Sequence, residues 1–372
     1  MAEPEPATAQ HQAAPDRSNA SRTAQRLSYL DGWRGLAIIS VLVGHFLGLY
    51  LPRLSVLGGY GVTLFFVLSG RLMADILFVQ RQPLPLFLQR RAARILPALI
   101  VFVNVMAVYA VLWFTWRGSV VMRPWEYLAA LTFTINYAQA LGGGPESRYL
   151  AHLWSLCVEE HCYIILALIA PLCARNSAAI KWLLAALGCA ALVRSIPLWM
   201  DNPDGVHAVN WRTEVSAAPL MLSAAVHVWI REKSPGNSRI ARLLGAATPW
   251  TWGCSLLLFF AAPNIVHYTV GPVLMALAVN GVDSSPAALK KCLAHPVLRS
   301  FGMLSYSLYL WQTPIMRYAW RFPPIALLFA AIAMGVISYF VIERPARQYL
   351  NRTALSRRSQ RLSKPERKSP AD

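Results

Sequence analysis

Long apolar runs are the feature that most constrains how this chain can fold. Of its 372 residues, 56% are hydrophobic and only 14% are charged, whereas a soluble domain carries about 25% charged residues. A helix needs about 20 apolar residues to span a bilayer. Candidate runs lie at 35–51, 56–78, 95–114, 125–141, 152–174, 180–200, 215–230, 246–262, 265–282, 297–316 and 324–342. The sequence therefore predicts an all-α, polytopic membrane helical bundle.

The basic residues between these runs indicate how many of them cross the membrane. Basic segments lie at 22–34, 81–94, 231–242, 290–299 and 351–372. If all are cytoplasmic, as the positive-inside rule predicts, the first seven runs cross an even number of times. The run 125–141 is short and contains polar residues, so we expect it to be re-entrant or interfacial. About ten transmembrane helices then remain, with both termini cytoplasmic, in a multi-pass protein of the plasma (inner) membrane.

The net charge of +18 does not indicate a nucleic-acid partner, because the charges lie largely between apolar runs and at the chain ends. Residues 1–26 are predicted to be a disordered cytoplasmic tail, 27–350 the membrane domain, and 351–372 a basic disordered tail near membrane lipids. The six cysteines show no CxxC pair and no Cys/His ligand spacing. Neither a disulfide framework nor a metal site is predicted.

An arginine and a histidine share one face of the first apolar run. Arg34 and His45 are eleven residues apart, about three helical turns or about 16 Å along the axis. Asp31 precedes Arg34 on the same side. An ionisable residue inside a bilayer is costly and indicates function by default. We expect Arg34 at the cytoplasmic mouth and His45 deep in the membrane.

A second polar stripe lies in HLWSLCVEEHCYIILALIAP. His152, Ser155, Glu159 and Tyr163 recur on one helical face. We expect Glu159 at about the depth of His45, where a carboxylate would orient the imidazole and raise its basicity. Glu160 is expected to point elsewhere. A stripe that only hydrates a vestibule is the alternative.

Two more clusters point to ligand binding. Arg91 and Arg94 abut the cytoplasmic start of the third run and suit a phosphate clamp, although an ordinary basic loop would look the same. Arg71 could snorkel to that surface. In SYSLYLWQTP, Tyr309 and Gln312 suit a polyhydroxylated acceptor. Hydrolase, ATPase, metalloprotease and dehydrogenase signatures are absent from the sequence.

Six motifs in this order resemble the acyltransferase 3 family of integral membrane O-acyltransferases. They are LDGWRGLAIISVLVGH, GVTLFFVLSG, RRAARILP, HLWSLCVEE, SYSLYLW and IERPAR, between about residues 30 and 347. The resemblance implies a bundle of about ten helices. It also implies transfer of an acyl group, usually acetyl, from cytoplasmic acyl-CoA to a hydroxyl of a glycan, a lipid-linked sugar or a small natural product.

The resemblance also implies roles for particular residues. His45 matches the essential histidine and Glu159 the acidic position after WSL; both are predicted to be catalytic. Arg34, Arg91 and Arg94 are predicted to bind acetyl-CoA, which is a donor substrate rather than a permanently bound cofactor. The predicted substrate-binding or supporting residues are Asp31, Trp154, Ser155, Tyr163, Tyr309 and Gln312.

Two positions depart from the family pattern. Many members have histidine where this chain has Gln312, and an aromatic residue where it has Cys162. No soluble esterase-like domain is expected after the membrane part, so transfer must finish within the bundle. The expected acceptor is an exported or cell-surface glycan such as exopolysaccharide, lipopolysaccharide or lipo-oligosaccharide. A macrolide-type sugar is the alternative acceptor, and a transporter or flippase is the alternative from another functional class.

Overall fold

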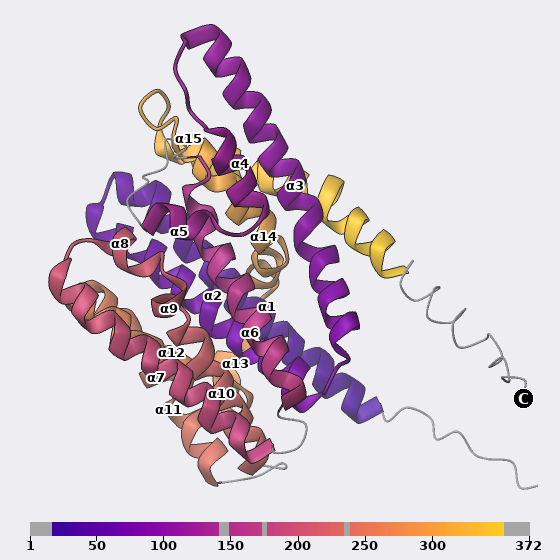
Figure 1. Ribbon diagram of the computed structural model, residues 1–372. Coiled ribbons are helices and arrows are strands. Elements are labelled where there is room, and N and C mark those ends of the chain that lie inside the picture. Colours follow the sequence, from indigo (N-terminus) through magenta and orange to yellow (C-terminus); the bar gives the residue numbers. More distant parts are fainter. Residues whose placement is uncertain (1–16, 141–148, 173–176, 234–238, 353–372) are drawn as a thin grey trace, which may run out of the picture.

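The computed structural model describes residues 17–140, 149–172, 177–233 and 239–352, and within them the regular structure is helical throughout (Figure 1). The α-helices are α1 (Arg17–Phe46), α2 (Val56–Ala74), α3 (Leu84–Arg117), α4 (Pro124–Leu131), α5 (Ile135–Ala140), α6 (Trp154–Leu172), α7 (Ser177–Asp201), α8 (Val206–Asn210), α9 (Thr213–Ser216), α10 (Ala218–Lys233), α11 (Arg239–Ala261), α12 (Asn264–Gly281), α13 (Ala287–Leu293), α14 (Pro296–Met316) and α15 (Pro324–Ser338).

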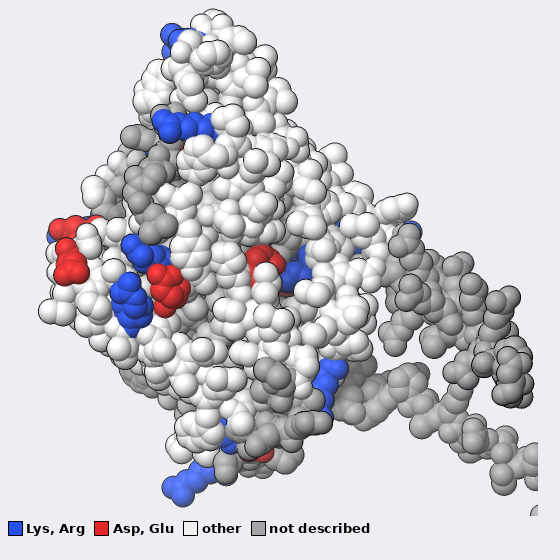
Figure 2. Space-filling model, in the orientation of Figure 1, with Lys and Arg blue, Asp and Glu red and all other residues white. Residues whose placement is uncertain are grey.

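The predicted membrane bundle is confirmed. Nine helical stretches of the described chain are long and apolar enough to cross a bilayer, by length and composition. Large apolar side chains lie on the outside, such as Leu112 on α3 and Trp182 on α7. Figure 2 shows one face of the molecule as mostly uncharged surface. Such an uncharged surface suits lipid. The helical backbone suits it as well, because its polar groups are hydrogen-bonded within each helix.

A tenth long helix, α14, lies within the bundle and packs against α1 and α15. It is not among the nine apolar stretches, and it buries Ser305, Tyr309 and Gln312. Together the ten long helices correspond to the ten runs that the sequence predicted to cross. The polar face of α14 therefore belongs to the interior of the bundle.

The run 125–141 does not form one helix. It is divided into α4 and α5, which have eight and six residues and are about 12 Å and 9 Å long at 1.5 Å per residue. Between them Phe133 has φ of 55°, in the left-handed region that ends a helix. Both pieces are too short to cross a bilayer, as the polar content of this run indicated.

The helical part extends further at both ends than the sequence predicted. α1 begins at Arg17, so the tail predicted over residues 1–26 is wrong for 17–26. That segment holds neither Gly nor Pro, and a helix leaving the bilayer continues through it. At the other end, helix continues from α15 through a π-helical turn (Tyr339–Glu343) to Arg352. The remaining parts of both predicted tails, 1–16 and 353–372, lie outside the described residues.

Close backbone contacts hold α1 against α14. A Cβ atom on Gly35 would lie 1.9 Å from the Leu298 carbonyl oxygen of α14. A Cβ atom on Gly302 of α14 would lie 1.9 Å from the Asp31 carbonyl oxygen of α1. Small residues permit such contact, and in a bilayer helix association depends on it. α1 and α14 are therefore held in one axial register.

Substitution of Gly302 tests this register. Gly302→Val should lower the melting temperature of the detergent-solubilised protein by about 5 °C or more, because overpacking against backbone costs about 1–3 kcal/mol or more. Gly253→Val is the matched control, since Gly253 is also helical but a Cβ there meets nothing within 4 Å. Equal melting temperatures for the two variants would show that the contact does not hold the helices.

Candidate functional site

Two cavities lie inside the bundle. The large cavity, about 880 Å³, is lined by residues that include His45, Gly58, Trp154, His207, Trp211, Tyr268 and Arg317. The small cavity, about 80 Å³, is lined by residues that include Arg34, Ser69, Arg91, Arg94, Glu159, Tyr163 and Tyr306. Val62, Phe66 and Tyr309 line both. Arg34 and His45, predicted to share one face of α1, therefore reach different cavities.

His45 is oriented by Gln312 and not by a carboxylate. The His45 Nδ1 atom lies 2.6 Å from Gln312 Oε1, and Gln312 Nε2 donates to Thr313 Oγ1 at 2.6 Å. Because an amide oxygen can only accept, Nδ1 carries the proton and Nε2 keeps its lone pair. The residue at the position that departs from the family pattern thus selects the imidazole tautomer.

The free nitrogen of His45 faces α2 at a glycine. A Cβ atom on Gly58 would lie 3.3 Å from His45 Nε2. Any larger side chain there would cover this nitrogen. Glycine at position 58 therefore leaves Nε2 open to the large cavity, where it can accept a proton from a bound molecule.

The predicted pairing of Glu159 with His45 is wrong. Glu159 Oε1 accepts hydrogen bonds from Ser69 and Tyr163, and Oε2 lies 3.8 Å from the Arg91 guanidinium. The two side chains lie at different depths in the bundle. His45 lies near His152, which precedes α6, whereas Glu159 is five residues into α6 from Trp154, about 7.5 Å further along at 1.5 Å per residue. Glu159 lines the small cavity instead.

Glu160, which we expected to point away from the polar stripe, lines neither cavity and binds Arg91. Arg91 donates to Glu160 Oε1 from Nε at 2.9 Å and from a terminal nitrogen at 2.6 Å. Its guanidinium carbon lies 3.4 Å from the centroid of the Tyr163 ring. Two carboxylates and an aromatic face surround this cation. Arg91 therefore joins α3 to α6, and its role as a phosphate clamp stays a prediction.

Arg34 and Arg94 differ from Arg91 in their surroundings. Both are half-buried on the small cavity, and neither guanidinium makes a hydrogen bond or ion pair with any part of the chain that the structure describes. Asp31 lies within electrostatic reach of Arg94 and Arg299. These two arginines are thus the side chains of the small cavity best placed to receive an anion.

Ser155 and Tyr309, two more of the predicted residues, lie where the two cavities adjoin. Ser155 Oγ lies 2.6 Å from the Tyr309 hydroxyl, which donates to the His152 carbonyl at 2.8 Å. The His152 ring contacts the rings of Phe102 and Tyr309 and lies near His45. A second imidazole, that of His152, thus lies near His45, although residue 312 is glutamine and not histidine.

Aromatic rings line the large cavity. Trp154 packs edge-on against Phe66 with ring centroids 6.0 Å apart, and His207 packs on Trp211 at 4.6 Å. Desolvation of its ring and then the positive charge of Arg317 lower the pKa of His207 below its usual value. His207 is therefore neutral at neutral pH. These flat faces and polar edges suit a sugar ring, which has both apolar and hydroxyl-bearing surfaces.

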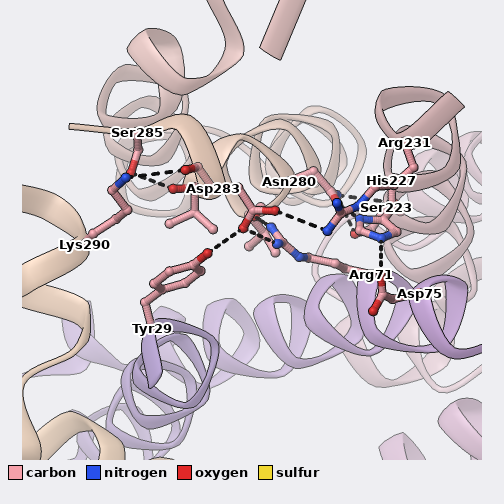
Figure 3. A network of polar contacts seen from close by, with 12 residues as sticks. Tyr29, Arg71, Asp75, Ser223, His227, Arg231, Asn280, Asp283, Ser285 and Lys290 are labelled. Carbon is pink, nitrogen blue, oxygen red and sulfur yellow. Dashed lines mark hydrogen bonds and ion pairs between the residues drawn. The ribbon is translucent and has the colours of Figure 1, made fainter. Parts of the chain in front are cut away.

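A separate polar network, which the sequence reasoning missed, lies between α1, α2, α10 and α12 (Figure 3). Arg71 donates to the Val279 carbonyl and, at 2.6 Å, to Asp283, which also accepts from Tyr29 at 2.8 Å. His227 lies 3.0 Å from Asp75. The side chain of Arg71 is only 1% exposed, so the expectation that it snorkels to a phosphate-binding surface is wrong.

His227 is the signal that could have revealed this network, because it is an ionisable residue within an apolar run. Its other ring nitrogen lies 3.2 Å from Asn280 Oδ1, and Asn280 donates to Ser223 at 3.0 Å. Arg71, Asp75, His227 and Asn280 line neither of the two cavities described above. Four helices are joined here by paired polar groups, which indicates a structural role. Among the described residues, no cluster of three His, Cys, Asp or Glu side chains could hold a metal ion.

Comparison with known proteins identifies a family that matches this chain. A family model for acyltransferase 3, described as an acyltransferase domain, matches residues 27–344. The peptidoglycan O-acetyltransferase OatA of Listeria monocytogenes is 28% identical over 353 residues, which cover 86% of this chain and 55% of the relative. A putative peptidoglycan O-acetyltransferase, YrhL of Bacillus subtilis, is 28% identical over 367 residues, covering 86% and 54%. A putative O-acetyltransferase of Staphylococcus aureus strain COL is 24% identical over 359 residues, covering 86% and 57%.

The chain thus spans about half the length of the curated relatives it matches. No solved structure matches it.

The Arg91–Glu160 pair generates a stability prediction. Glu160→Gln or Arg91→Gln alone should lower the melting temperature markedly, because each leaves a mostly buried charge without its partner. The double variant should be less destabilised than the sum of the two single variants, and a double-mutant cycle measures the difference. Additive effects would show that the two groups do not interact in the folded protein.

Proposed function

Because the chain belongs to the acyltransferase 3 family, we propose that it is a membrane O-acetyltransferase. It moves an acyl group, acetyl in the simplest case, from cytoplasmic acyl-CoA to a hydroxyl of a cell-surface glycan. The observation that carries this proposal is the arrangement of the two cavities. An imidazole with a free nitrogen lies on one cavity and two unpaired guanidiniums lie on the other, and the cavities meet at shared residues.

The donor binds at the small cavity. Guanidinium groups bind phosphates through charge-assisted hydrogen bonds, and Arg34 and Arg94 are the groups available. A volume of about 80 Å³ is far below the roughly 300–1,000 Å³ of pockets that hold whole small molecules. The nucleotide therefore stays at the mouth, and only the thin pantetheine arm enters. We therefore assign the arginine side of the bundle to the cytoplasm, where the positive-inside rule also puts the basic loops.

The acceptor binds at the large cavity. Its volume of about 880 Å³ lies within the range for whole ligands, and its aromatic faces suit sugar rings. The relatives named as peptidoglycan O-acetyltransferases support a glycan of the cell surface, or its lipid-linked precursor, reached from the outer side of the inner membrane. A small natural product such as a macrolide sugar is the second candidate acceptor.

His45 is the general base in the proposed mechanism. Its neutral Nε2 takes the proton of the acceptor hydroxyl while the hydroxyl oxygen attacks the thioester carbonyl. The carbon–sulfur bond then breaks, and the CoA thiolate receives the proton from the imidazolium. The products are the ester and free CoA, with no net proton uptake. A transient acyl-imidazole would give the same products.

Gln312 and Glu159 are positioning residues in this scheme. Gln312 holds the tautomer that leaves Nε2 free. Glu159 binds Ser69 of α2, Tyr163 of α6 and, more distantly, Arg91 of α3, and so fixes the walls of the small cavity. Because no net proton leaves the site, the reaction needs no proton path through the Arg71 network.

The first test is acyl transfer itself. Membranes containing the protein, incubated with radiolabelled acetyl-CoA and total cell-surface glycan, should place label in alkali-labile ester. His45→Ala should lower the rate by about 10²–10⁴, the usual contribution of a general base. Gln312→Leu should lower kcat by about tenfold or more with little change in KM for acetyl-CoA, since it disturbs the imidazole and not the donor site. Transfer by His45→Ala within a few-fold of wild type would contradict this role. Acceptor movement without acyl-CoA would indicate a transporter.

The donor site has its own test. Arg34→Gln and Arg94→Gln should each raise KM for acetyl-CoA by about tenfold or more while leaving KM for the acceptor nearly unchanged, because each removes a charged contact to phosphate. Arg90→Gln is the matched control, since Arg90 lies in the same basic segment but is exposed and bonds Gln82. An equal effect at position 90 would mean that the basic segment acts only through its overall charge.

A further inference from the structure

We propose that Phe66, with Val62 and Tyr309, forms an aperture that limits the acyl group to about the size of acetyl. This inference rests on the proposed function and deepens it, because it assigns the donor specificity to particular side chains. The aperture is defined by the three residues that line both cavities. In the described part of the chain, no other residue is shared between them.

The chemistry requires the reacting carbonyl to lie at this place. The thioester comes from the side of Arg34 and Arg94, and the acceptor hydroxyl comes from the side of His45. The carbonyl carbon must meet the hydroxyl oxygen, and the two cavities meet only where their walls coincide in the described residues. The acyl group attached to that carbon therefore lies against Val62, Phe66 and Tyr309 during transfer.

The side chains of the aperture are held by their neighbours. Tyr309 is fixed by Ser155 at 2.6 Å and by the His152 carbonyl at 2.8 Å. Phe66 is 4% exposed and packs edge-on against Trp154. Val62 lies one turn before Phe66 on the same face of α2 and is branched at Cβ, which restricts its rotamers. Packing and hydrogen bonds therefore restrict the rotamers of all three side chains.

The helices that carry them are also held. A Cβ atom on Gly61 would lie 2.5 Å from the Ala37 carbonyl oxygen of α1, and one on Gly70 would lie 2.0 Å from the Leu220 carbonyl oxygen of α10. α2 is thus in backbone contact on both sides of Phe66. α14, which carries Tyr309, contacts α1 in the same way at Gly302. The two helices that carry the aperture residues, α2 and α14, are therefore each held against α1.

A rigid apolar wall discriminates by size. One additional methylene in a fitted pocket changes specificity by about 10–200-fold, because a close-packed interior cannot yield without strain. Acetyl places one methyl group against the wall. Butyryl adds two methylenes, for which the aperture has no room unless Phe66 is shortened.

The experiment compares donors in membranes containing wild type, Phe66→Ala, Val62→Ala and Phe259→Ala. Phe259 is the matched control: it is 2% exposed and packs edge-on against Tyr60, but it lines neither cavity. The measured quantity is the ratio of initial rates with radiolabelled acetyl-CoA and butyryl-CoA at equal concentration, which does not depend on the amount of folded protein.

We expect wild type to prefer acetyl by tenfold or more. Phe66→Ala should lower the acetyl-to-butyryl ratio at least tenfold, Val62→Ala should lower it less, and Phe259→Ala should leave it unchanged. If Phe66→Ala does not fold, Val62→Ala and Phe66→Leu give the same comparison. A ratio within twofold of wild type in every folded aperture variant, or a wild type that uses both donors equally, would overturn the assignment. If wild type transfers neither acyl group, the proposed function itself fails, and the aperture falls with it.

Discussion

The backbone contact of α1 with its neighbours is the constraint on which the site depends. Gly35 of α1 and Gly302 of α14 let these two helices touch, and this contact sets the height of one helix against the other. At that height His45 lies opposite Gln312 and Arg34 opens onto the small cavity. A shift of one turn would move a side chain by about 5 Å and separate the imidazole from the amide that orients it.

Two arginines inside the described bundle are paired with carboxylates. Arg91 pairs with Glu160 and Arg71 with Asp283, as a physical rule predicts, because an isolated ion in a low-dielectric interior is costly. Arg34 and Arg94 depart from this rule on the small cavity. Their charge finds no hydrogen-bonded or ion-paired partner in the described chain, and in the proposed function the anionic donor supplies one. On that proposal, the contrast between paired and unpaired arginines distinguishes structural positions from ligand-binding positions.

Gln312 changes the chemistry expected at His45. A carboxylate partner would stabilise the imidazolium as well as orient the ring, whereas an amide oxygen orients the ring without contributing a full charge. In the proposed mechanism, the proton that His45 accepts is therefore passed on at once to the departing thiolate. On that proposal, fixed geometry contributes more to catalysis than charge balance does. The helices that meet through glycine and the side chains held by hydrogen bonds and ring packing are consistent with it.

The sequence by itself determined the membrane bundle and indicated that the run 125–141 does not cross the membrane as one helix, because apolar length and polar content are properties of one segment. It also indicated the stripe on α6 and the polar face of α14. Only the tertiary structure decided that His45 meets Gln312 and not Glu159, that Arg91 binds Glu160, and that Val62, Phe66 and Tyr309 divide two cavities. Those outcomes depend on the axial offset and rotation between helices. Backbone contacts between distant segments set both quantities, and the periodicity of a single run does not contain them.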